Sequence, residues 1–288
     1  MKNEDLSNFE KNGFIILKNV FDKKYLDKIK SNCYKLFKQD YQTGLLPDKI
    51  KWKKSDKKNN LPRSLCNIWK SNRSVASLSL NNRIGKIASF LMNWDSVRLN
   101  QDSVIWVPPK CGNVSFHQDE PYQDWHLPGK IITAWIPLSK TYKKGATIEY
   151  VTGSHKWKFS KRLNTFLGAN DYMYHLKKYT KKKMNIFSVE INKGDIVMHH
   201  GRIWHGSTIN RTTKNRMSIS IHLMSGKSKF HPVISNPLFT KFKHFNSLRM
   251  DESFFPIIWS KKKYRSNFIN NYIKIKKIKL KKINLENC

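Results

Sequence analysis

The residues RMSISIHL, at positions 216–223, alternate without interruption between polar and apolar side chains. Successive residues of a β-strand point to opposite faces, so one face of this strand carries only apolar side chains and the other carries an arginine, two serines and a histidine. In a β-barrel, a polar inner face is unusual unless the interior holds a site or the outer face packs against helices. The pattern therefore predicts a β-structure whose polar face can hold a ligand.

Further short β-like runs precede this strand from residue 97 onward. They are separated by Gly, Pro, Asn and Asp, and no helical pattern alternates with them, which is typical of an all-β barrel or sandwich. Together with 216–223, their number fits a double-sheet jelly roll. The runs lie at residues 97–107, 113–118, 130–138, 146–151, 185–191 and 194–200.

The N-terminal part has a different pattern. Residues 13–19 (GFIILKN) predict a short strand, and Asp22 can cap the helix of about four turns that the apolar spacing after it predicts. Residues 40–75 are polar, rich in lysine and without a pattern, so we expect a long surface excursion of the kind that often forms a functional lid. Residues 76–94 again predict a helix.

The chain of 288 residues suits one domain, since a domain of this size buries about 75% of its unfolded surface. We expect a single domain over residues 1–258, with N-terminal helices at about 21–94 and the jelly-roll core at about 97–225. Residues 259–288 form a basic tail, for which we expect a peripheral or frayed element. The N-terminus does not resemble a secretory signal, and no stretch reaches the roughly 20 apolar residues that span a bilayer.

Charge and cysteine content bear on the protein's partners and environment. The chain has 55 Lys+Arg against 20 Asp+Glu, a net charge of +35, which attracts polyanions without specificity. Lys, Asn and Ile are abundant together, as in chains encoded by AT-rich genes, so we favour a compositional origin and expect no specific nucleic-acid partner. Cys33, Cys66, Cys111 and Cys288 are scattered without a CxxC pair, which favours small buried side chains or inert surface thiols, rather than ligands, in a reducing, cytoplasmic setting.

Candidate metal ligands lie in the segment 115–120 (SFHQDE). On a strand, residues two apart share a face at a separation of about 6.6 Å, so His117 and Asp119 can converge on one ion while Gln118 turns away. Alone, this triplet is weak support for a metal site, because a His or Asp on a strand is usually a hydrogen-bonded surface residue.

A third ligand is available in the segment 194–207 (GDIVMHHGRIWHGS). His205 lies beyond a turn and precedes Gly206, which allows close backbone approach. His199 and His200 are rival ligands, and we expect one of them to face solvent or a backbone carbonyl. Two histidines and a carboxylate that leave three positions open form the facial triad of non-haem Fe(II) oxygenases.

Arg216 lies on the polar face of the alternating strand. Its planar guanidinium can pair both oxygens of a carboxylate, and each such charge-assisted bond contributes about 1.5–3 kcal/mol. It is therefore a candidate for binding an anionic co-substrate, with a surface ion pair as the alternative interpretation.

Taken together and in order along the chain, these motifs resemble the phytanoyl-CoA dioxygenase (PhyH) family of Fe(II)/2-oxoglutarate-dependent oxygenases. The resemblance covers roughly residues 8–258 and implies an all-β core with flanking helices, a double-stranded β-helix of the jelly-roll or cupin-like type. The motifs that carry it are GFIIL (13–17), FHQD (116–119), AWIPL (134–138), GATIEYVTGSHK (145–156), GD (194–195), and HG (200–201) through HGS (205–207) to Arg216.

The resemblance also implies roles for single residues. It implies that His117, Asp119 and His205 bind Fe(II). Arg216 follows His205 by the family's interval of 11 residues, which implies that it pairs the distal carboxylate of 2-oxoglutarate, and Ser207 would donate a hydrogen bond to the same carboxylate.

Three further positions follow from the resemblance. Gln101 and Trp135 fall where relatives line the co-substrate pocket, although Trp135 fits an ordinary core aromatic nearly as well. His155, in the GSHK segment, lies outside the metal shell in the family, so we interpret it as structural. Asp119 retains the carboxylate that halogenating relatives replace with a small residue, which favours hydroxylation.

We therefore expect a dioxygenase that uses Fe(II), 2-oxoglutarate and O2 to hydroxylate an aliphatic C–H bond of a small molecule, with release of succinate and CO2. The basic surface suggests an anionic substrate, and residues 40–75 and 121–128 are candidate walls of its pocket. The alternative is a basic polyanion-binding protein on an inactive jelly-roll scaffold. The sequence identifies neither the substrate nor the oligomeric state.

Overall fold

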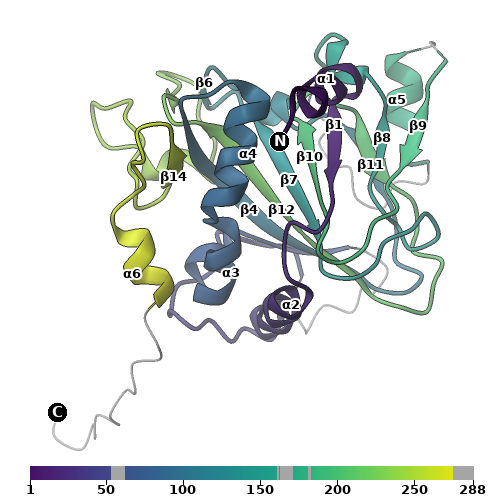
Figure 1. Ribbon diagram of the computed structural model, residues 1–288, viewed down its shortest axis with the longest axis horizontal. Coiled ribbons are helices and arrows are strands. Elements are labelled where there is room, and N and C mark those ends of the chain that lie inside the picture. The colour runs from purple at the N-terminus through teal and green to yellow at the C-terminus, as the bar shows by residue number, and fades with distance from the viewer. Residues whose placement is uncertain (53–61, 161, 163–170, 181–182, 275–288) are drawn as a thin grey trace, which may run out of the picture.

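The computed structural model describes residues 1–52, 62–160, 162, 171–180 and 183–274 (Figure 1). Within these residues, two antiparallel sheets face each other as a jelly roll, and helices cover the outer face of the larger sheet. The fold class that the sequence predicts is therefore confirmed.

The larger sheet has eight strands in the order β1-β10-β7-β12-β4-β3-β2, and β14 also pairs with β4. Its longest strand is β4, which pairs with β12 over nearly the whole length of both. The strands are β1 (Phe14–Leu17), β2 (Lys49–Ile50), β3 (Arg63–Cys66), β4 (Ser96–Val107), β7 (Ile132–Pro137), β10 (Ile196–His200), β12 (Arg216–Ser225) and β14 (Ile257–Ser260).

The smaller sheet has four strands in the order β5-β11-β8-β9, and a two-stranded sheet pairs β13 with β6. Every β-run predicted from the sequence forms a strand. The strands of these two sheets are β5 (Val114–His117), β6 (His126–Leu127), β8 (Glu149–Val151), β9 (Ile186–Ser188), β11 (His205–Ser207) and β13 (Lys229–Phe230).

The alternation in β12 separates the helix layer from the interior. Met217, Ile219, Ile221 and Leu223 are fully buried in the main apolar core, to which the helices α2, α3 and α4 also contribute. Figure 1 shows α3 and α4 in front of the large sheet. The helices are α1 (Asn3–Asn12), α2 (Lys23–Phe37), α3 (Arg73–Ser79), α4 (Asn82–Met92), α5 (Tyr174–Tyr179) and α6 (Phe268–Lys274).

The N-terminal predictions hold in part. The Asp22 side chain accepts a hydrogen bond from the Tyr25 N–H at 2.9 Å and caps α2, as expected. The expectation of a patternless excursion at 40–75 is wrong for the described part of that segment, because β3 pairs with β4 and β2 pairs with β3. These strands are too short for their periodicity to stand out from the lysine-rich sequence around them.

The C-terminal part contains a strand and a helix that the sequence does not indicate. The predicted boundary at residue 258 falls inside β14, and α6 buries Ile269 against the same core as α3. Residues 275–288, including Cys288, lie outside the described residues. Cys33, Cys66 and Cys111 are free and buried, which selects the first of the two alternatives left open by the sequence. Among the described helices, none is long and apolar enough to cross a membrane.

One carboxyl group, that of Asp102 in β4, is buried between the sheet and the helices. It accepts hydrogen bonds from the Ser79 hydroxyl at 2.6 Å and from the Trp69 N–H at 3.4 Å. Burial outweighs these bonds and raises the pKa of Asp102 to about 7. The folded protein therefore retains a proton that the unfolded chain releases at lower pH, so this group costs stability as the pH rises towards 7.

We predict that Asp102→Asn removes this pH dependence. Since the extra proton binds only in the folded state, the free energy of unfolding of the wild type should fall relative to the variant by roughly 2 to 3 kcal/mol between pH 5 and pH 8. Urea denaturation of both proteins across this range measures the difference. A difference that stays constant with pH would contradict the assignment.

Candidate metal centre and co-substrate pocket

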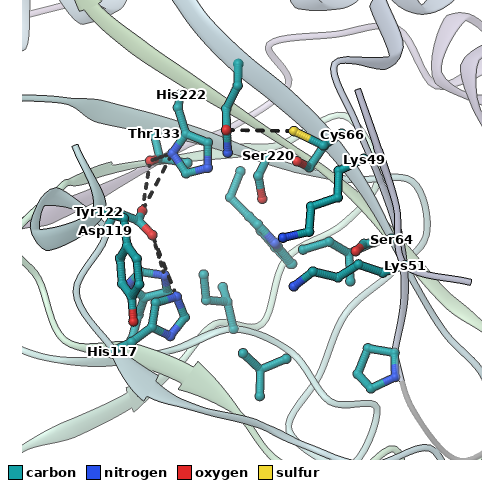
Figure 2. A pocket seen from close by; sticks show the side chains of 18 of the residues that line it. Lys49, Lys51, Ser64, Cys66, His117, Asp119, Tyr122, Thr133, Ser220 and His222 are labelled. Carbon is teal, nitrogen blue, oxygen red and sulfur yellow. Dashed lines mark hydrogen bonds and ion pairs between the residues drawn. The ribbon is translucent and has the colours of Figure 1, made fainter. Parts of the chain in front are cut away.

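A cavity of about 440 Å³ lies between the two sheets (Figure 2). Polar side chains from both sheets line it, which fits the polar inner face predicted for β12. All seven site residues that the sequence singled out line this cavity, namely Gln101, His117, Asp119, Trp135, His205, Ser207 and Arg216.

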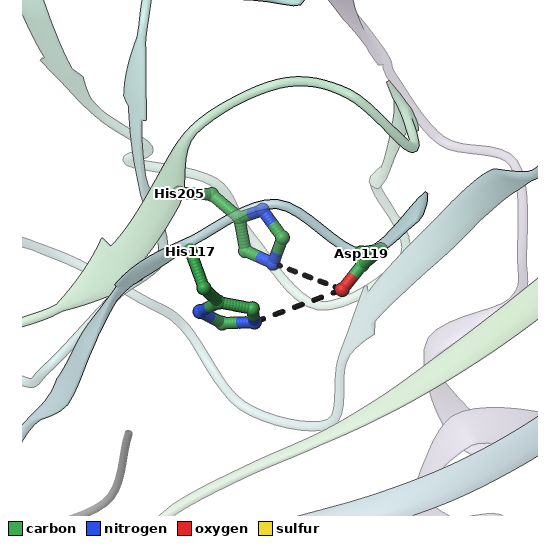
Figure 3. A group of neighbouring side chains, drawn as sticks. All are labelled: His117, Asp119 and His205. Carbon is green, nitrogen blue, oxygen red and sulfur yellow. Dashed lines mark ion pairs between the residues drawn. The ribbon is translucent and has the colours of Figure 1, made fainter. Parts of the chain in front are cut away.

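Three of these side chains point toward one another (Figure 3). Asp119 Oδ1 lies 3.6 Å from His117 Nε2 and 3.6 Å from His205 Nε2, and the candidate ligand atoms of the three residues all lie within 4.8 Å of one another. His117 ends β5, Asp119 follows two residues later, and His205 begins β11. The fold thus brings together residues that are far apart in the sequence.

Backbone pairing fixes the two histidines. His117 and His205 are cross-strand partners, and Gly206 allows this close pairing because a Cβ there would lie 2.8 Å from the Val114 carbonyl oxygen. The Nδ1 of His117 lies 2.8 Å from the Ser115 carbonyl oxygen, and His205 Nδ1 makes the equivalent bond to a carbonyl at 3.0 Å. A carbonyl can only accept, so Nδ1 is protonated and each Nε2 keeps its lone pair for a metal.

The electrostatics of the site suit a cation. Burial lowers the pKa of both His117 and His205 to about 4, so both imidazoles are neutral at neutral pH. Burial alone would raise the pKa of Asp119, but the surrounding histidines, His205 foremost, hold that pKa well below its usual value. The site therefore presents two neutral nitrogen ligands and one negative oxygen ligand.

The second oxygen of Asp119 is held by neighbours that do not belong to this trio. Thr133 donates its hydroxyl hydrogen to Asp119 Oδ2 at 3.2 Å and lies 2.8 Å from His222 Nδ1. His199 Nε2 lies 3.3 Å from the same oxygen, and its Nδ1 lies 2.8 Å from the Tyr150 hydroxyl. These bonds fix the carboxylate so that Oδ1 faces the two histidines.

Sequence reasoning gave only part of this arrangement. His199, which the sequence makes a rival metal ligand, lies behind Asp119. His200 is half-buried and accepts a hydrogen bond from the Arg202 N–H at 3.0 Å. Thr133 was missed, although it occupies the polar face of its strand next to the AWIPL motif. His222 can be identified as a cavity residue from its place in the alternation of β12, which puts its side chain on the cavity side.

Arg216 also lines the cavity and is buried. Its guanidinium donates to the Ala146 carbonyl at 2.7 and 2.9 Å and to the Ser218 hydroxyl at 2.9 Å. It also lies 5.9 Å from the ring centroid of Trp135. Burial lowers its pKa to about 10, so the group remains charged at neutral pH.

Two of the remaining predicted positions line the cavity, and one lies outside it. Ser207 is buried in β11, two residues after His205, and lines the cavity. Gln101 also lines the cavity and accepts a weak hydrogen bond from the Cys66 thiol at 3.7 Å. His155 does not line the cavity, and its Nε2 lies 3.1 Å from the Glu10 carbonyl oxygen, in agreement with a structural role.

Fold and site together define a jelly-roll protein with two histidines and one carboxylate, the ligand set typical of non-haem iron oxygenases. The family model of phytanoyl-CoA dioxygenase (PhyH) matches residues 9–218. The chain belongs to this family.

Known proteins are similar to this chain at low sequence identity. The phytanoyl-CoA dioxygenase domain-containing protein 1 homolog of Caenorhabditis elegans is 23% identical over 76% of this chain and 90% of its own. The epimerase SnoN, solved with Fe3+, alpha ketoglutarate and nogalamycin RO, matches with a TM-score of 0.70 and 17% identity, covering 89% of this chain and 98% of its own. EctD from S. alaskensis, solved with 2-oxoglutarate and 5-hydroxyectoine, matches with a TM-score of 0.64 and 18% identity, covering 80% and 78%.

We predict that Thr133→Val weakens metal binding. The variant keeps the side-chain shape but removes the donor to Asp119 Oδ2, and loss of such a bond behind a metal ligand typically costs about 10- to 100-fold in affinity. Anaerobic titration with Co(II), followed by its visible absorption, measures this affinity. Thr147→Val is the matched control, because Thr147 is also buried but donates to the Val189 carbonyl outside the cavity. Equal metal affinity in both variants would show that the Thr133 hydroxyl does not support the site.

Proposed function

We propose that this protein is a non-haem Fe(II)- and 2-oxoglutarate-dependent dioxygenase that hydroxylates an aliphatic C–H bond of a small molecule. The observation that carries the proposal is the convergence of His117, Asp119 and His205 at one end of a cavity that also contains a buried, charged arginine. Two proteins of this fold support the same assignment, since SnoN was solved with Fe3+ and alpha ketoglutarate and EctD with 2-oxoglutarate.

The residues present fit a ferrous ion. Two neutral imidazole nitrogens and one carboxylate oxygen are a ligand set that iron(II) accepts, and ligands on neighbouring strands leave the cavity side open to other molecules. The bonds to Asp119 Oδ2 keep this carboxylate in one orientation, so it offers Oδ1 without rearrangement. We propose these three residues as the iron ligands.

The residues present also fit 2-oxoglutarate. Arg216 is charged and buried, and no described carboxylate forms an ion pair with it. Its guanidinium is oriented by the Ala146 carbonyl, so an incoming carboxylate meets a donor already in position. We propose that Arg216 and Ser207 bind the distal carboxylate, with Trp135 and Gln101 as neighbouring walls of the co-substrate pocket.

When bound, the iron supplies the oxidation of 2-oxoglutarate by O2 to succinate and CO2 that is coupled to hydroxylation of the substrate. The chain's own contribution is to hold the ligands, bind the anion and exclude water. Asp119 supports hydroxylation, because a carboxylate ligand leaves no room for a halide at its position.

We predict that His117→Ala and Arg216→Ala fail in different ways. His117→Ala removes an iron ligand, so iron binding and succinate formation should both be lost. Arg216→Ala should retain iron but raise the KM for 2-oxoglutarate by roughly 10- to 100-fold, because one or more charge-assisted bonds of about 1.5–3 kcal/mol are removed.

Succinate formation in air, after anaerobic loading with Fe(II), measures both effects without a known substrate. His244→Ala and Arg211→Ala are matched controls, because both side chains are exposed and outside the cavity. A wild type that binds no iron and forms no succinate would contradict the proposal and favour the polyanion-binding alternative.

A further inference from the structure

One wall of the cavity is built from two segments that lie far apart in the sequence, and each contributes a side-chain amide. Gln123 comes from the first segment and Asn236 from the second. Trp125 joins the segments, because its ring stacks on Phe239 with the centroids 4.3 Å apart and its carbonyl accepts a hydrogen bond from the His231 N–H at 2.8 Å. The two amides therefore belong to one packed unit.

The side-chain amide of Gln123 has one favourable orientation. The Trp125 indole N–H lies 3.2 Å from it, and since an indole can only donate, it must face the amide oxygen. Asn100 donates to the same oxygen at 2.8 Å. Both donors are buried, and neither is among the described residues that line the cavity.

The nitrogen of this amide is consequently the polar atom that Gln123 can offer to the cavity. It has no hydrogen-bond partner among the described residues, whereas the oxygen has two. Gln123 lines the cavity and is otherwise buried, with 4% of its surface exposed. The side chain thus presents N–H donors and no acceptor.

A β-bulge in β4 explains how Asn100 reaches this amide. Gln101 pairs with His222 and Leu99 pairs with Leu223, so Asn100 is an extra residue with no partner on β12. Bulges often redirect a side chain beside a functional site. Here the strand loses one regular pair and gains a donor that holds the amide oxygen of Gln123.

The side-chain amide of Asn236 is oriented in a similar way. Its oxygen accepts a hydrogen bond from the Leu238 N–H at 2.9 Å, and a backbone N–H can only donate. Its nitrogen has no hydrogen-bond partner within the part of the chain that the structure describes, and the side chain lines the cavity. This wall therefore offers donors from two neutral amides whose oxygens are already occupied.

These donors lie close to the proposed iron site and beside apolar side chains. Gln123 follows Asp119 after a short 3₁₀ helix, Glu120–Tyr122, and its N–H donates to the Glu120 carbonyl at 2.8 Å. Leu238 and Phe239 also line the cavity. Small-molecule pockets commonly combine apolar walls with a few polar groups that fix the orientation of the ligand.

We propose that Gln123 selects the primary substrate by donating a hydrogen bond to one of its carbonyl oxygens, with Asn236 as a further donor and Leu238 and Phe239 against its apolar part. This inference rests on the proposed function, because it names the substrate class of the same site. A group that can only donate, such as an ammonium, would leave these N–H groups unpaired and is disfavoured.

The test compares cyclohexanone with methylenecyclohexane, in which a CH2 group replaces the carbonyl oxygen, and with cyclohexylamine. NMR titration of the full-length protein follows the signal of the Gln123 side-chain amide, identified by its loss in Gln123→Glu, and the signals of other cavity residues give each Kd. Every titration is made without metal and again with Zn(II) and 2-oxoglutarate.

Gln123→Glu is the decisive variant, because it keeps an oxygen for Trp125 and Asn100 but replaces the N–H donors with an acceptor. Gln42→Glu is the matched control, since the Gln42 oxygen also accepts a backbone N–H, that of Arg73 at 2.9 Å, on an exposed side chain outside the cavity.

We expect cyclohexanone to bind more tightly than the other two probes and to shift the Gln123 amide signal. Gln123→Glu should weaken cyclohexanone binding by at least the roughly 2- to 10-fold effect of one neutral hydrogen bond and should strengthen cyclohexylamine binding. Gln42→Glu should change neither affinity.

Three results would overturn the inference: the Gln123 amide signal does not respond to cyclohexanone, methylenecyclohexane binds as tightly as the ketone, or a folded Gln123→Glu binds the ketone as the wild type does. If this variant does not fold, the first two comparisons, both on the wild type, still decide. Failure to bind metal or 2-oxoglutarate would instead contradict the proposed function, because the amide response is also measured without them.

Discussion

The buried carboxylate of Asp119 is the constraint on which the site depends. An ionised group with so little exposure is stable only where it is fully hydrogen-bonded or paired with a cation. One of its oxygens is bonded to Thr133 and His199, and the other faces His117 and His205. The first oxygen therefore serves to orient the carboxylate, and we propose that the second binds the metal.

The two sheets supply the neighbours that the Asp119 carboxylate requires. Pairing of β5 with β11 sets the two histidines side by side, and the larger sheet contributes the residues behind the carboxylate. The polar side chains of this sheet can face inward because its apolar side chains are covered by α2, α3 and α4. Helix packing on one face and the polar cavity on the other are thus two consequences of the same alternating sequence.

Sequence reasoning predicted the strands and the chief site residues because these depend on local periodicity and on motifs with fixed spacing. It did not predict β3, whose four residues carry little periodicity, or α1. Nor could it assign the contacts of Thr133, His199 and His222 with Asp119, since these depend on which strands are neighbours.

The most direct test of this account is anomalous diffraction at the iron edge, from crystals loaded anaerobically with Fe(II) and 2-oxoglutarate. We predict one iron peak bonded to His117 Nε2, His205 Nε2 and Asp119 Oδ1, with the distal carboxylate of 2-oxoglutarate paired with Arg216. An iron peak at other residues, or no peak at full Fe(II) loading, would contradict the assignment of this site.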